Sequence, residues 1–188
     1  MSRLFKIGFV ALFAMLATGC SIVAPKYSPS IPNVGQLKSA GDFNAKVGKF
    51  TSVDGSPGNA NPISIRGSGM HSPYNNSYAE YLAAAIAQEL ELAGRLNPGS
   101  QLEISGLLQK NDLDGSGMNT GTGDIQARFV VKKAGAIVYD QVKVAHIKWE
   151  SSFAGAIAIP KAQQSYPDLV SKLLETLYAD NNFINALK

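Results

Sequence analysis

Three stretches in which apolar and polar residues alternate constrain the fold of this chain more than any other feature. They cover residues 102–110, 123–132 and 137–149. Alternation with a period of two is typical of strands that bury one face. Residues 133–136 read Lys-Ala-Gly-Ala, a hairpin-turn signal between the second and third stretches. The sequence therefore predicts three antiparallel strands in succession, with Val130 as the one apolar residue at an outward position of the second.

The apolar phase of the third stretch changes near residues 140–141. Before this point Ile137 and Tyr139 lead the pattern, and after it Val142 and Val144 lead. A slip of one residue in a strand indicates a β-bulge, because side chains alternate between the two faces. We therefore expect a bulge near residues 140–141, with these four side chains leading the buried face.

A helix is predicted between Ser77 and Gly94. Ser77 and Glu80 form a capping box, and Gly94 is typical of a helix end. Leu82 belongs to the apolar stripe of this helix, and Glu89, seven residues later, falls inside the same stripe. We expect the Glu89 carboxylate to reach out to water near the helix end; the alternative is a functional acid.

A second helix is predicted from a capping box at Ser165 and Asp168, with Leu173 in its buried stripe. Residues 151–161 precede it. Because they contain Gly155 and Pro160, which resist helix formation, we expect a strand end and a crossover there.

Two further short strands are expected at residues 45–51 and 63–66. Residues 53–62 form a Gly/Pro/Asn-rich loop, and residues 67–76 are expected to be a connection. The predicted order is strand, strand, helix, three strands, helix. This order predicts an α+β two-layer sandwich, with a mainly antiparallel sheet and two helices on one face.

Residues 1–20 have the parts of a bacterial export signal in the usual order. Arg3 and Lys6 precede an apolar run that is about half the ~20 residues that a membrane-spanning helix needs. Residues 16–20, Leu-Ala-Thr-Gly-Cys, resemble the lipobox of bacterial lipoproteins, with Leu16 one place before the usual aliphatic position. The alternative, a transmembrane anchor or a buried helix, fits the length and flanks less well.

The lipobox resemblance implies that residues 1–19 are a signal peptide and that Cys20 is the lipid attachment site. The acyl groups of such lipoproteins make a permanent membrane anchor. Ser21 is similar to the sorting residue of outer-membrane lipoproteins, so we expect an outer-membrane lipoprotein facing the periplasm. The expected organisation is a lipidated N-terminus and tether over residues 20–44, followed by a periplasmic α+β domain over residues 45–188.

Residues 21–40 have two interpretations. Prolines fix φ and lack an N–H group, so Pro25, Pro29 and Pro32 favour an extended tether. Alternatively, the apolar residues of this segment pack along the edge of the domain; they are Tyr27, Ile31, Val34 and Leu37.

The charge balance argues against nucleic acid as a partner. The whole chain has a formal net charge of +3, and removal of Arg3 and Lys6 with the signal peptide would leave +1. Basic residues are interspersed with acidic ones and form no run. Cys20 is the single cysteine, so no disulfide is expected within the chain.

The loop at residues 111–122 is the best candidate for a metal site. Asp112, Asp114 and Ser116 occupy the first, third and fifth places of an EF-type calcium loop. That motif closes with a bidentate glutamate at the twelfth place, where this chain has Gly123. We therefore expect a polar loop without useful calcium affinity.

Other candidate chemistry is sparse. His71 and His146 are the two histidines, and neither has a zinc partner near it in sequence. The glycine-rich segments lack a Walker lysine and the G-x-S-x-G spacing. Trp149, Phe153 and residues 154–158 are expected in the core, the alternative being an apolar groove for a lipid tail or partner. We expect no catalytic residue, no cofactor and no metal; a Ser-His-Asp triad assembled by the fold stays open.

The order of segments resembles a known family. The segments are the lipobox, YSPSIPNV, YLAAAIAQELELAG, LEISGLLQ, DIQARFVVKKAGAIVYDQ, the W-x-S-S-F-A-G turn and LVSKLLETLYADNNFINAL. Together they are similar to the uncharacterised YajG-type lipoproteins and, more distantly, to auxiliary lipoproteins of ABC-type lipid transporters. The family has no agreed catalytic residues, so the resemblance implies no site.

These observations favour a non-enzymatic, lipid-anchored envelope protein that acts as an accessory or adaptor domain in the periplasm. Its partners would be the membrane, through the anchor, and an envelope protein or lipid. The alternatives are an auxiliary lipoprotein that binds a lipid transporter or a lipid, and an envelope hydrolase. A flat apolar patch would favour a protein partner, a long apolar groove lipid transport, and a deep pocket with Ser or carboxylate residues a hydrolase.

Overall fold

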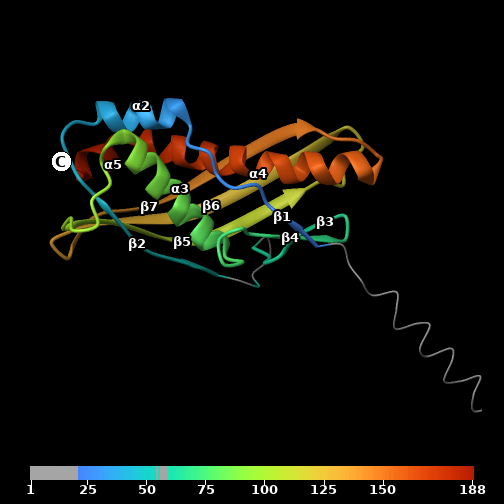
Figure 1. The fold of residues 1–188 in the computed structure, drawn as a ribbon, viewed down its shortest axis with the longest axis horizontal. Helices are drawn as coiled ribbons and strands as arrows, with labels where there is room; N and C mark the ends of the chain where they lie inside the picture. Colours follow the sequence, from blue (N-terminus) through green and yellow to red (C-terminus); the bar gives the residue numbers. More distant parts are fainter. Residues whose placement is uncertain (1–20, 54, 56–58) are drawn as a thin grey trace, which may run out of the picture.

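The computed structural model describes residues 21–53, 55 and 59–188. Its main sheet has four strands in the order β2-β5-β6-β7. These strands are β2 (Lys46–Ser52), β5 (Leu102–Asp114), β6 (Thr120–Lys133) and β7 (Ala136–Glu150). β6 runs antiparallel to its neighbours β5 and β7, and β2 pairs parallel to β5 (Figure 1). The three strands and the turn between β6 and β7 are as predicted, but β5 and β6 extend into residues 111–114 and 120–122, which were expected to be loop.

A second, smaller sheet lies near one end of the main sheet. It has the order β1-β4-β3, and its strands are β1 (Ser21–Val23), β3 (Ile63–Ile65) and β4 (Ser68–His71). β4 was expected to be part of a connection. It forms because Arg66 and Gly67 adopt positive φ angles of 48° and 83°, which turn the chain back so that β4 pairs with β3.

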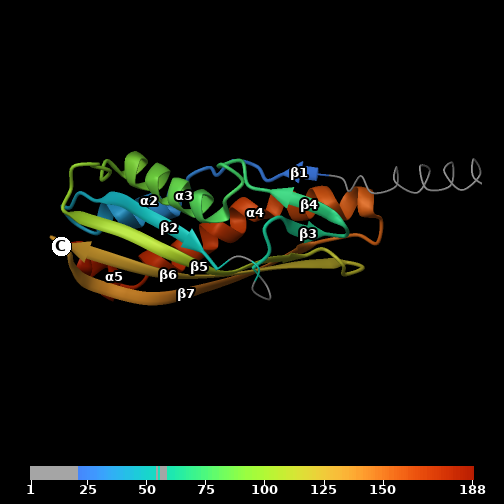
Figure 2. The same ribbon diagram turned by 90° about the horizontal axis from the view of Figure 1, so that it is seen from below.

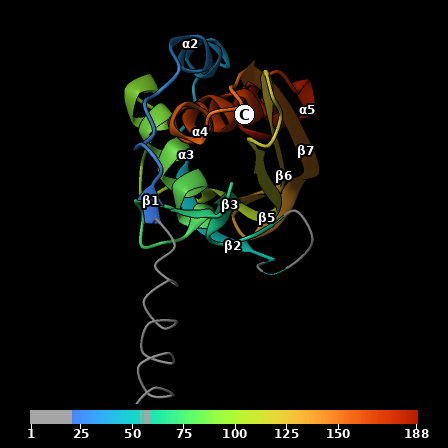
Figure 3. The same ribbon diagram turned by 90° about the vertical axis from the view of Figure 1, so that its right-hand side faces the viewer.

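The described residues contain four helices. They are α2 (Ile31–Ser39), α3 (Tyr78–Ala93), α4 (Gly155–Tyr178) and α5 (Asn181–Ala186). α3 and α4 pack on the same face of the main sheet, and α2 lies on them (Figures 2 and 3). This arrangement confirms the α+β sandwich. The opposite face of the main sheet carries no described helix.

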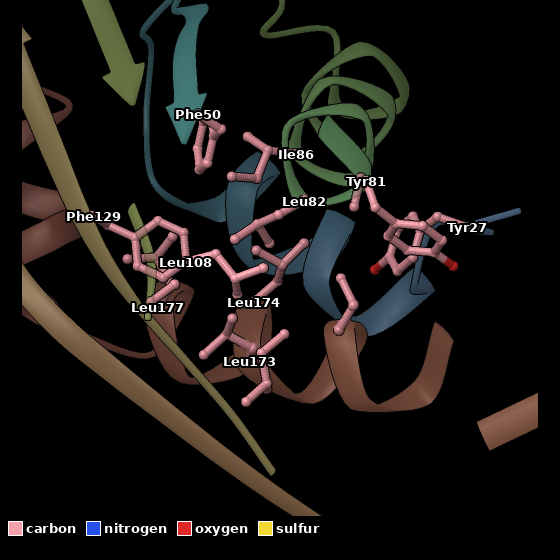
Figure 4. Packing of buried hydrophobic residues seen from close by; sticks show 14 of the residues in the cluster. Tyr27, Phe50, Tyr81, Leu82, Ile86, Leu108, Phe129, Leu173, Leu174 and Leu177 are labelled. Carbon is pink, nitrogen blue, oxygen red and sulfur yellow. The ribbon is translucent and has the colours of Figure 1, made fainter. Parts of the chain in front are cut away.

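The core fills the space between the helices and the main sheet (Figure 4). α3 begins and ends as predicted, because the Ser77 Oγ accepts a hydrogen bond from the Glu80 N–H at 3.2 Å and Gly94 has a φ of 72°. Its stripe meets Phe129 and the leucines of α4. The central side chains are Leu82, Ile86, Leu108, Phe129, Leu173, Leu174 and Leu177.

α4 begins ten residues before the predicted capping box. Gly155 is its first residue, and both Pro160 and Pro167 lie within it. Ser165 is no N-cap: its hydroxyl donates to the Lys161 carbonyl at 2.8 Å, one turn earlier in the same helix. Each proline removes one backbone hydrogen-bond donor from the helix. Packing outweighs this loss of stability, because α4 buries a long apolar face in which Ala158 is fully covered.

Residues 24–43 pack on the domain and do not form an extended tether. Of the two interpretations of this segment, the structure shows the one in which it packs along the domain. Tyr27, Val34 and Leu37 are buried, whereas Ile31 is exposed. Pro32 does not prevent helix formation because it lies in the first turn of α2, where an N–H would have no partner.

Candidate partner-binding face

The uncovered face of the main sheet displays two apolar side chains that the sequence had placed in the core. Val142 is 44 % exposed and Val144 is 56 % exposed, and both belong to the edge strand β7. The predicted bulge near residues 140–141 does not form. The register shift lies earlier, beside Val138, and β7 then pairs with β6 without interruption. Val142 and Val144 therefore point away from the helices.

Lys143 takes the inward position that the sequence gave to a valine. Its Nζ lies 2.6 Å from Asp180 Oδ2, at the junction of α4 and α5, and the Tyr139 hydroxyl donates to the same oxygen at 2.8 Å. Burial opposes ionisation of Asp180, but the hydrogen bonds from Lys143 and Tyr139 outweigh it and lower the pKa of this carboxyl. This ion pair stabilises Lys143 at an inward position, in phase with the buried Tyr139 and Ala145.

Neighbouring strands extend the apolar area. The register places Leu107 of β5 opposite Arg128 of β6, and Arg128 opposite Val142. Val130, as predicted, is also at an outward position, beside Ser105 and Asp140. Leu107 and Val130 are half-buried. We call Leu107, Val130, Val142 and Val144 the open-face patch.

Charges of both signs surround the open-face patch. Arg128 binds the Asp140 carboxylate through two guanidinium nitrogens, and this pair raises the pKa of Arg128 and lowers that of Asp140. Asp124 lies 3.6 Å from Lys110 Nζ and 3.1 Å from His146 Nδ1. Both acidic side chains, Asp140 and Asp124, are thus paired with a basic side chain within the face.

Glu89 is a buried carboxylate, so the expectation that it reaches water is wrong. Its side chain is 0 % exposed. Oε1 accepts hydrogen bonds from the Tyr27 hydroxyl at 2.6 Å, the Ser30 N–H at 3.1 Å and the Asn33 amide at 3.2 Å. Tyr27 and Ser30 lie before α2 and Asn33 lies in its first turn. The local pattern of α3 gives no sign of these donors.

The pKa of Glu89 is raised by burial, although the hydrogen bonds from Tyr27, Ser30 and Asn33 act in the opposite direction. Burial and the Glu89 charge together raise the pKa of the Tyr27 hydroxyl. These hydrogen bonds join α3 to residues 27–33. They explain why a charged residue is found in an apolar stripe.

The other sequence candidates lie apart from one another. Cys20 lies outside the described residues. Asp112 and Asp114 lie at the end of β5, where the Asp114 carboxylate accepts a hydrogen bond from the Ser116 N–H at 2.8 Å. His71 is on β4 and His146 on β7. Within residues 21–53, 55 and 59–188, no three His, Cys, Asp or Glu side chains come together.

The residues expected in the core, with a lipid groove as the alternative, divide between two environments, and the expectation is wrong for Phe153. Trp149 packs partly against the core and Ala158 is buried, whereas Phe153 is exposed. A separate shallow groove of about 440 Å³ lies between β2 and α3. It is lined by Val47, Gly48, Lys49, Phe50, Tyr74, Glu80, Ala83, Ala84 and Ala87.

No family model matches this sequence, and none of the curated proteins matches it. The fold is similar to that of a Xanthomonas campestris protein assigned to DUF330, with a TM-score of 0.52 and 12% identity, over 82% of this chain and 91% of that chain. This likeness shows a shared fold. The resemblance to YajG-type lipoproteins stays a prediction.

Two further solved structures are similar at lower scores. A candidate lipoprotein from Caulobacter crescentus has a TM-score of 0.43 and 11% identity, over 82% of this chain and 96% of that chain. A hypothetical protein from Chlamydia trachomatis has a TM-score of 0.47 and 8% identity, over 77% of this chain and 99% of that chain. In the part of the sequence covered by the structure, no helix is long and apolar enough to cross a membrane.

Proposed function

We propose that this protein is a lipid-anchored envelope protein that binds a protein partner through the open-face patch and acts without catalysis, as an accessory or adaptor domain. The exposure of Val142 and Val144 on the sheet face that carries no described helix is the observation that carries this proposal. Contiguous exposed apolar groups are typical of interaction sites.

The shape and charge of the face favour a protein over a lipid tail or a polyanion. The patch lies on a sheet surface, so it matches a partner that covers it and not a ligand that enters it. The paired charges of Arg128 with Asp140, and of Asp124 with Lys110, suit a partner surface that also carries both signs.

Cys20 places this binding domain at a membrane. Its lipobox supports acylation, and Ser21 supports the outer membrane as the destination and the periplasm as the compartment. Tethering at a membrane raises the effective concentration of any partner held there. Intact-mass measurement of the membrane-extracted protein should show loss of residues 1–19 and gain of lipid; a mature protein without added lipid would contradict the anchor.

Site-specific photo-crosslinking in intact cells tests the binding face. A crosslinking residue at position 142 or 144 should give the same adduct, whereas one at Leu92, an exposed apolar residue of α3, should not. The captured protein should then bind the purified wild type and bind Val142→Asp more weakly. Equal adducts at all three positions, or unchanged binding by Val142→Asp, would contradict the proposal.

A narrower version assigns the protein to a lipid transport system. It rests on the resemblance to auxiliary lipoproteins of ABC-type transporters, and the groove between β2 and α3 is where a lipid chain could lie. Capture of a transporter subunit from position 142 would support it. Turnover of an envelope substrate by the purified protein would instead favour the hydrolase alternative.

A further inference from the structure

One end of the domain is assembled from four segments that are distant in sequence. Arg66, in the turn between β3 and β4, donates hydrogen bonds to the carbonyls of Gly115 at 2.6 Å and Phe153 at 2.6 Å. It also reaches the carbonyls of Ser116, Gly117 and Ser152. The β5–β6 turn and the segment before α4 are therefore held together on the β3–β4 turn.

β1 is held at the same end of the molecule. It pairs with β4, and the Gln163 side chain of α4 donates to the Val23 carbonyl at 2.6 Å. Figures 1 and 2 show β1, the β3–β4 turn, the β5–β6 turn and the start of α4 at one end of the long axis, and Figure 3 looks onto it. We call this region the anchor end.

Four large apolar side chains are exposed at the anchor end, one or two from each of three segments. Val23 of β1 is 54 % exposed, Met118 of the β5–β6 turn 68 %, Phe153 before α4 78 % and Ile157 of α4 49 %. Exposure of apolar side chains to water is unfavourable in free energy. Here the segments that carry them are held in place by the hydrogen bonds of Arg66 and Gln163. A surface built in this way matches an apolar or interfacial partner.

The chain itself indicates that partner. β1 begins at Ser21, so one peptide bond separates the sheet from Cys20. Consecutive Cα atoms are about 3.8 Å apart, which leaves no spacer between an acyl group on Cys20 and the anchor end. A domain that is anchored through an acyl group on Cys20 therefore has the bilayer next to Val23 of β1.

We infer that the anchor end is a membrane-binding surface, on which Val23, Met118, Phe153 and Ile157 enter the headgroup region of a phospholipid bilayer. Aromatic and aliphatic side chains on one face give interfacial attachment, whose strength grows with the apolar area that leaves water. The contact would orient the domain with its long axis away from the bilayer. The inference rests on acylation of Cys20, as the proposed function does, but it is independent of the open-face patch.

Depth-dependent fluorescence quenching tests this inference on the full lipidated protein in phospholipid vesicles. An environment-sensitive dye is attached to the introduced cysteine of the Phe153→Cys and Met118→Cys variants. Ile137→Cys is the matched control, because Ile137 is 59 % exposed and follows the β6–β7 turn at the opposite end of the sheet. Unsubstituted protein treated with the same dye reports any free Cys20, which separates failed acylation from failed insertion.

Lipids that carry a quencher in the acyl chain should reduce the emission at positions 153 and 118 and leave position 137 unchanged. Equal quenching at all three positions, or none at 153 and 118 in acylated protein, would overturn the inference. Protection of position 153 that persists in detergent and depends on protein concentration would assign this surface to a second copy and would also overturn it. Circular dichroism should show that each variant is folded.

Discussion

Replacement of Glu89 by alanine should destabilise the domain, because three donors would lose their acceptor. Tyr27 and Asn33 are buried, and Asn33 keeps one further hydrogen bond, to the Ser171 carbonyl at 3.1 Å. A buried donor without a partner costs ~1–3 kcal/mol, and removal of a buried carboxylate offsets part of that loss. We expect the free energy of unfolding to fall by about 2–4 kcal/mol.

Chemical denaturation at neutral pH, followed by circular dichroism, measures this change. Glu91→Ala is the matched control, because Glu91 lies two residues away on the same helix and is exposed. It should change stability by no more than about 0.5 kcal/mol. A Glu89→Ala variant with the same free energy of unfolding as Glu91→Ala would refute the idea that the Glu89 hydrogen bonds hold residues 27–33 on α3.

Three further predictions concern the core, the ionisation of Glu89 and the loop at residues 111–122. Leu173→Ala should cost about 2–5 kcal/mol in a denaturation experiment, since Leu173 is fully buried in the core. The raised pKa of Glu89 means that the folded state binds the Glu89 proton more tightly than the unfolded state does. The stability that this proton contributes is complete below the ordinary pKa of 4.5 and is lost as pH rises through the folded-state pKa. The free energy of unfolding of Glu89→Gln, measured across this pH range, should lack this loss, and parallel curves for the variant and the wild type would disprove the prediction. Calorimetry should detect no micromolar calcium binding at residues 111–122, because the bidentate glutamate is missing; binding abolished by Asp114→Ala would overturn this.

The sequence predicted those elements whose signals are local. α3 has its capping box and terminal glycine, and the β6–β7 turn has Ala134 and Gly135 at positive φ. The start of α4 was missed because Gly155 and Pro160 lower helix propensity locally, whereas contacts of Ala158 and later residues with other elements stabilise the helix.

The open-face patch was not predicted because Lys143, which lies between its two β7 valines, was assigned to the outward face. Val142 and Val144 look like core residues when the strand is considered alone. In the structure Lys143 faces inward in phase with Tyr139, Ala145 and Trp149, and its Nζ binds Asp180 of a remote segment. Glu89 illustrates the same limit, since its partners Tyr27 and Asn33 are more than fifty residues away in sequence.

The central claim is that an anchored domain acts by binding through the open-face patch. Complementation of a deletion strain tests it most directly, with wild type, a Val142→Asp/Val144→Asp double variant and Leu92→Asp, all expressed at the native level and shown to be folded. Leu92 is the control because it is an exposed apolar residue away from the patch. We predict that wild type and Leu92→Asp reverse any defect of the deletion strain and that the double variant does not. Full rescue by the double variant would contradict the account.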